Sequence, residues 1–132
     1  MGQQTTPKNI TTHHDGHGLA ESIHVFATDE VGPGGAHHLY QFTVDGVPDG
    51  PDETVGFLQF QKGPRNDPNS TPGVLTVAVL AALIDIQDDF DAGPYPSEFG
   101  RLAGYHMREA LLALRRRADE RASRGVLGKN AS

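Results

Sequence analysis

The chain has 132 residues, contains no cysteine and carries a formal net charge of -6 at neutral pH. This length suits one domain with a modest core, and the missing cysteine excludes disulfides and thiol catalysis. The negative charge argues against a general nucleic-acid binder, because binding to a polyanion depends on summed positive charge.

Residues 1–21 form a polar segment that has neither the basic start nor the apolar stretch of a targeting peptide. We expect a disordered tail here, in a protein of the reducing cytoplasm. Three histidines in this tail have no carboxylate or cysteine at ligand spacing, and the adjacent His37 and His38 would point to opposite faces of a strand. We therefore expect no metal site and no cofactor.

Three segments between residues 22 and 62 have the pattern of β-strands. In each, β-branched and aromatic residues partly alternate with polar ones, and Gly, Pro and Asp fill the connections. The segments are SIHVFATDE (22–30), AHHLYQFTVDG (36–46) and TVGFLQFQK (54–62). We predict that they form an antiparallel sheet.

A first helix is predicted over residues 72–90, where Thr71 can cap the free N–H groups and Pro72 suits the first helical position. It is apolar on nearly every face, which indicates cover by the sheet on one side and by a second helix or another subunit on the other. Its apolar run, residues 74–84, is about half of the roughly 20 residues needed to span a bilayer, so we expect no membrane partner.

A second helix, capped by Ser97, is predicted over residues 98–123. Helical spacing indicates that its buried stripe consists of Phe99, Ala103, His106, Ala110 and Leu114. The sequence thus predicts one α+β domain over residues 22–128, with a small antiparallel β-sheet packed on a C-terminal helical hairpin. The nearly all-apolar first helix suggests a homodimer or a larger assembly.

Arginines follow one another at the end of this second helix. Arg108 and Arg115 lie opposite the predicted stripe and need no function, whereas Arg117, Arg121 and Arg124 continue it. The Cβ atoms of Arg117 and Arg121 would be about 5–6 Å apart, close enough to hold neighbouring phosphates. The alternative is that the helix outruns its neighbour, leaving arginines that reach water or pair with the acidic end of the first helix.

Phe90 and Tyr95 bracket the short turn between the two predicted helices. An aromatic residue in such a turn is more often part of a core than a ligand platform. If one of them faces the arginines, however, a purine can stack on its ring. An aromatic ring with paired arginines would be a minimal nucleotide site.

Five short motifs occur along the C-terminal part of the chain: FQKGP (60–64), TPGV (71–74), ID (84–85), FDAGPY (90–95) and RADERASRGVLG (117–128). Their order resembles that of motifs in phage-encoded sponge proteins, which counter bacterial Thoeris and CBASS immunity by sequestering nucleotide second messengers. From residue 84 to 128 the spacing of the motifs matches that family without a gap.

The resemblance covers about residues 54–128. It implies a homo-oligomeric protein, in the cytoplasm of the infected bacterial host, that sequesters signals of the cyclic ADP-ribose type or cyclic oligonucleotides. It also implies that Phe90 stacks on the ligand and that Arg117 and Arg121 contact its phosphates. The family has an asparagine where this chain has Gly100, so this part of the ligand site would lack a side-chain amide. The resemblance therefore implies a changed ligand preference or a reduced affinity for the ligand.

The sequence contains no convincing nucleophile with its base, phosphate-binding glycine loop or pair of carboxylates in an apolar setting, so we expect no enzymatic activity. Two alternatives to the sponge remain open. One is a non-catalytic phage protein that binds a host protein through its helical hairpin, with the arginines as anchors. The other is an enzyme that cleaves the nucleotide.

Overall fold

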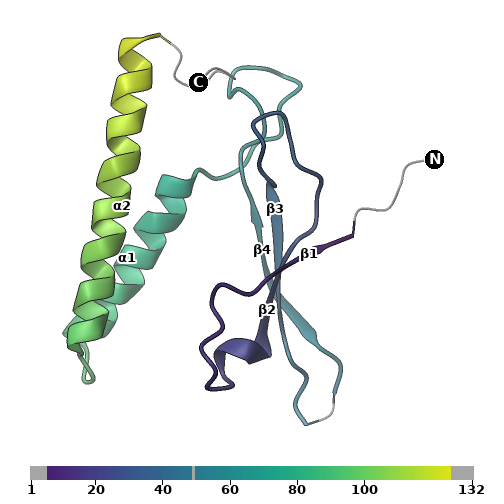
Figure 1. Ribbon diagram of the computed structural model, residues 1–132, viewed down its shortest axis with the longest axis vertical. Helices are drawn as coiled ribbons and strands as arrows, with labels where there is room; N and C mark the ends of the chain where they lie inside the picture. The colour runs from purple at the N-terminus through teal and green to yellow at the C-terminus, as the bar shows by residue number, and fades with distance from the viewer. Residues whose placement is uncertain (1–5, 49, 126–132) are drawn as a thin grey trace. The chain divides into compact units, whose positions relative to one another are not determined.

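The computed structural model describes residues 6–48 and 50–125, which belong to two compact units. The first unit holds the β-strands together with residues 69–73, and the second holds residues 64–68 and two long helices (Figure 1). The chain is therefore an α+β protein, as predicted. Neither helix, over the described residues, combines the length and the apolar character that crossing a bilayer requires.

The sheet is an antiparallel meander in which each strand pairs with the next one along the chain. Its order is β1 (Lys8–Ile10), β2 (Ile23–Ala27), β3 (Leu39–Val44) and β4 (Glu53–Gln59), with a short 3₁₀ helix, Ala20–Ser22, leading into β2. The three predicted strands are thus confirmed as β2, β3 and β4. Among the described apolar residues of this unit, Ala27 of β2 is completely buried.

The expected disordered tail spans residues 1–21, of which residues 1–5 lie outside the described part of the chain and the rest contains a short strand, β1. Within the described part of this segment, β1 pairs with β2, with Lys8 opposite Ala27 and Ile10 opposite Val25. This strand has only three residues, which is too short for an alternating pattern to be visible in the sequence. It forms because β2, once paired with β3, still offers hydrogen-bonding groups along its other edge.

The second unit is a hairpin of two adjacent helices, α1 (Thr76–Ala92) and α2 (Glu98–Ser123), joined by residues 93–97. The predicted bounds of α2 are confirmed, and so is its cap, because the Ser97 hydroxyl accepts the N–H of Gly100 at 2.9 Å. The predicted start of α1 was too early. Thr71 instead exchanges two backbone hydrogen bonds with Lys62, and the N-cap position of α1 belongs to Leu75.

The buried face of α2 also differs from the prediction. The predicted stripe is largely exposed, as shown by Phe99, whose exposed fraction is 83%. Gly100 and Gly104 instead lie beside Gln87 and Asp91 of α1. The less exposed line on α2 continues from them at spacings of three and four residues, and comprises Gly100, Gly104, Met107, Leu111, Leu114, Ala118 and Arg121. Small residues decide this orientation, because they let the helix backbones approach closely.

Candidate functional site

Phe90 and Gly100 lie near the closed end of the helical hairpin. Phe90 is on the last turn of α1, and 60% of its surface is exposed. Gly100 is on the first turn of α2, close to Gln87 and Asp91, which flank Phe90 along α1. Phe90 therefore has an exposed ring that is available for stacking.

Arg117 and Arg121 lie on successive turns near the other end of α2. Arg117 is exposed, whereas Arg121 is buried, with only 7% of its surface exposed. Positive side chains at this end of a helix are favoured by the helix dipole, with or without a ligand. The structure thus places the two arginines at the predicted spacing but gives them different environments.

One chain does not bring Phe90 together with the two arginines. A helix rises 1.5 Å per residue, so the part of α2 between Gly100 and Arg117 is about 25 Å long. Phe90 lies at the Gly100 end of the hairpin, so about this length of helix separates it from Arg117, and Arg121 lies one turn further along α2. A pocket containing all three side chains therefore requires two chains.

The packing of Gly100 gives this glycine a structural explanation. A Cβ atom added at Gly100 would lie 2.8 Å from Nε2 of Gln87 and 3.0 Å from Oδ1 of Asp91. The Gln87 amide donates a hydrogen bond to that same Asp91 oxygen at 3.1 Å. An asparagine at position 100 would have to displace the Gln87 side chain. No sequence motif predicts this contact, because the two residues belong to different helices.

Two other arginines of α2 pair with carboxylates. Arg108 donates to Asp88 of α1 at 2.5 Å, and this hydrogen bond, together with the negative charge, raises the pKa of Arg108. Arg124 pairs with Glu120 one turn earlier on α2. The acidic end of α1 thus contacts Arg108, on the face for which we expected no ligand role.

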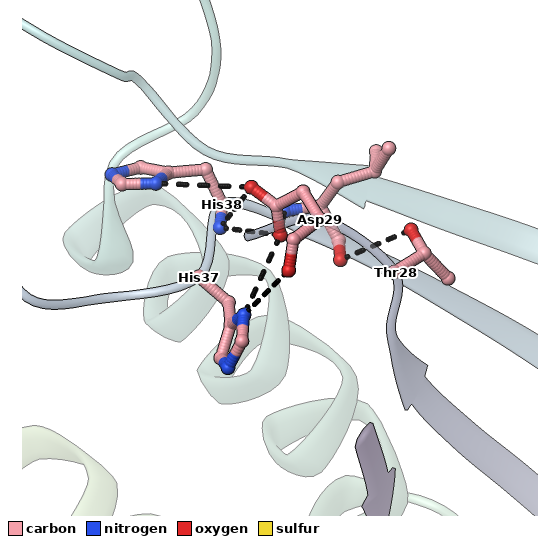
Figure 2. A network of polar contacts seen from close by, with 5 residues as sticks. Thr28, Asp29, His37 and His38 are labelled. Carbon is pink, nitrogen blue, oxygen red and sulfur yellow. Dashed lines mark hydrogen bonds and ion pairs between the residues drawn. The ribbon is translucent and has the colours of Figure 1, made fainter. Parts of the chain in front are cut away.

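Sequence reasoning missed a polar network that closes the loop between β2 and β3. The Asp29 carboxylate accepts the backbone N–H groups of His38 at 3.0 Å and Leu39 at 3.1 Å, and His37 Nδ1 lies 2.8 Å from the Asp29 carbonyl oxygen (Figure 2). Partial burial raises the pKa of Asp29, but the backbone N–H groups of Leu39, His38 and Asp29 itself and the electrostatic effect of His37 together keep the pKa below its ordinary value. We assign this network a structural role, because its contacts connect the loop to the start of β3.

A second polar cluster in the sheet unit has the composition of a metal site. His24, Asp45 and Asp52 each offer one ligand atom within 4.8 Å of the other two. Within this cluster, His24 Nε2 lies 2.6 Å from Asp45 Oδ1. Its members come from three segments of the chain, so no motif in the sequence announced it.

No protein-family model matches this chain, and no curated protein matches it significantly.

Proposed function

We propose that this protein is a phage-encoded sponge that binds small cyclic nucleotides and sequesters them without cleavage. The observation that carries the proposal is the pair Arg117 and Arg121, on successive turns at the end of α2. Two guanidinium groups at this spacing suit neighbouring phosphates, because each can form two parallel charge-assisted hydrogen bonds. The motif resemblance adds the class of ligand, a cyclic ADP-ribose or a cyclic oligonucleotide.

The binding pocket in this proposal is shared between two chains. About 25 Å of helix separates the Phe90 end of one hairpin from Arg117, which exceeds the reach of one small nucleotide. A second copy placed with its hairpin reversed would bring its own arginines to this Phe90. The exposed apolar side chains on the hairpin support such an assembly, and they include Leu83, Ile86, Phe90, Phe99 and Leu102.

Sequestration needs tight binding, and a two-chain pocket favours it. Nanomolar affinity corresponds to about 12 kcal/mol, which is more than an open surface patch provides for a small ligand. Arg121 is buried in one chain, so a phosphate reaches its guanidinium only after neighbouring side chains move. Arg117 remains exposed and available to the phosphates.

The decisive experiment compares two neighbouring arginines by calorimetric titration with cyclic ADP-ribose isomers and cyclic oligonucleotides. Arg117→Ala should weaken binding about 10- to 100-fold, because a hydrogen bond to a charged group contributes about 1.5–3 kcal/mol. Arg116→Ala is the matched control, since Arg116 is exposed on the same helix and its loss changes net charge equally. Arg108 is a poorer control because it pairs with Asp88. Equal loss of affinity in both variants would contradict the phosphate contact.

A second measurement separates the sponge from its two alternatives. The nucleotide is incubated with the protein, the protein is denatured, and the released material is analysed by chromatography. A sponge depletes free nucleotide and then releases it intact, whereas an enzyme releases an altered product. A protein whose function is to bind a host protein through the hairpin would deplete no nucleotide in this test.

A further inference from the structure

We propose that His24, Asp45 and Asp52 bind a divalent transition-metal ion at one end of the β-sheet. Its three residues belong to the sheet unit, and none of them is a residue of the proposed nucleotide pocket. The ligand atoms would be one imidazole nitrogen and one oxygen from each carboxylate.

The backbone holds the three side chains close together. His24 lies on β2 opposite Thr43 of β3, Asp45 directly follows β3, and Asp52 directly precedes β4. The N–H of Asp45 donates to the Ser22 carbonyl at 3.0 Å, which ties the end of β3 to the start of β2. One proposed ligand therefore lies on a paired strand, and the other two directly adjoin paired strands.

The connection between β3 and β4 folds back on itself and brings the two aspartates together. The N–H of Gly46 donates to Oδ1 of Asp52 at 3.3 Å. A Cβ atom at Gly46 would overlap the carbonyl group of Gly50, so the close approach of these backbone segments depends on glycine. Asp45 and Asp52 thus meet although they lie at opposite ends of the connection.

The distances in the cluster are close to those of a metal site. Zinc bonds of about 2.0–2.2 Å place neighbouring ligand atoms about 3.4 Å apart in a tetrahedral site. The His24 and Asp45 atoms are 2.6 Å apart, and all three atoms lie within 4.8 Å of one another. Small side-chain rotations would therefore bring the three atoms to the required spacing, with no change in strand pairing.

Charge and exposure favour an ion here. An ion pair would explain why His24 lies close to Asp45, but it would not explain the second carboxylate, Asp52, at the same place. One neutral imidazole and two carboxylates together carry a charge of about -2, which a divalent ion neutralises. The side chains of His24 and Asp45 are 31% and 53% exposed, so an ion can enter and water can complete its coordination.

The donor set selects the class of metal. An imidazole nitrogen suits zinc and its transition-metal neighbours, whereas magnesium and calcium prefer oxygen ligands alone. A bound ion would connect β2 to both ends of the β3–β4 connection. We therefore assign this metal a stabilising role in the sheet unit, because an ion that binds only the folded state shifts the folding equilibrium toward it.

Calorimetric titration of the full-length, tag-free chain with zinc chloride tests this site. We expect one zinc ion per chain, and Asp52→Asn should weaken its binding at least about 10-fold, the lower range for disturbing a metal's surroundings. This variant keeps the oxygen that accepts the Gly46 N–H, so circular dichroism should show an unchanged fold. His24→Ala should weaken zinc binding as well, and magnesium should not compete.

His14 and His17 provide the control, because histidines near the N-terminus could also bind zinc. The variant His14→Ala with His17→Ala should bind zinc as tightly as the unaltered chain. If it loses zinc while Asp52→Asn and His24→Ala retain it, or if the unaltered chain binds no zinc, the proposed site is wrong. If Asp52→Asn loses both zinc binding and its fold, the zinc affinity of His24→Gln is compared with that of the unaltered chain. An unchanged affinity in His24→Gln would also overturn the proposal.

Discussion

At the residue scale, Glu21 anchors the loop that precedes β2. Its carboxylate accepts three backbone N–H groups, from Gly18 at 2.7 Å, Gly16 at 3.1 Å and Asp15 at 2.6 Å. These hydrogen bonds, led by that of Gly18, lower the pKa of Glu21 from 4.5 to about 2. Gly16 and Gly18 have positive φ angles of 83° and 95°, so the carboxylate restrains a backbone that is otherwise very free.

This contact predicts a pH-dependent loop. Because the folded pKa is depressed, the stabilisation is fully present above pH about 4.5 and is lost as pH falls through about 2. At neutral pH, Glu21→Gln should remove most of it, since a neutral amide accepts hydrogen bonds more weakly. Hydrogen exchange followed by NMR should then show faster exchange at the amides of Gly16 and Gly18.

Glu53→Gln serves as the control for this measurement, because Glu53 is an exposed carboxylate on β4 of the same sheet. It should leave those two amides unchanged. Equal exchange rates in the unaltered chain and in Glu21→Gln would show that the carboxylate does not hold the loop.

At the element scale, the helical hairpin depends on two glycines with unequal space around them. A Cβ atom at Gly104 would lie 3.5 Å from Nη1 of Arg108 and 3.6 Å from Cγ of Gln87, which are ordinary contact distances. At Gly100 the nearest atom would be only 2.8 Å away. Alanine therefore fits at position 104, whereas at position 100 a neighbouring side chain must move.

We predict that Gly104→Ala stabilises the hairpin. Alanine is a better helix former than glycine by about 0.8–1.0 kcal/mol, and the added methyl group meets no steric conflict. Urea unfolding, monitored by the helical circular dichroism signal, should show a free energy of unfolding that is higher by nearly this value. Gly100→Ala should gain less, because the Gln87 amide must shift. A loss of stability in Gly104→Ala would mean that the helices pack more closely than described.

At the scale of the whole molecule, exposed apolar side chains predict self-association. On the hairpin they line both helices, with Leu83, Ile86 and Phe90 on α1 and Phe99 and Leu102 on α2. Burying such surface contributes about 25 cal/mol per Å², so a second copy is a favourable cover for it. We expect light scattering at micromolar concentration to give at least twice the chain mass of 14.2 kDa.

Two variants locate the contact. Ile86→Lys should lower the measured mass, because a charge would enter the apolar contact. Val55→Lys, at an exposed position on β4, should leave the mass unchanged if the hairpin makes the contact. A mass near 14 kDa for the unaltered chain would remove the two-chain pocket from the proposed function.

The sequence by itself determined the features whose physical causes are local. Ser97 and the periodic residues after it predicted the start and end of α2, because a cap and a helical pattern act within a few residues. Turn residues and β-branched runs predicted β2, β3 and β4 for the same reason. The spacing of Arg117 and Arg121 is likewise a property of one helix, and it needs no knowledge of the rest of the chain.

Only the tertiary structure decided the features that depend on contacts between distant segments. It showed that β1 adds to β2, that Thr71 pairs with Lys62, and that the Gly100 face of α2 packs on α1. It also separated Phe90 from the arginines within one chain and brought His24 to the two aspartates. Hydrophobicity along one helix cannot reveal these arrangements, because the choice between faces depends on which surfaces fit closely, and this is a property of two segments together.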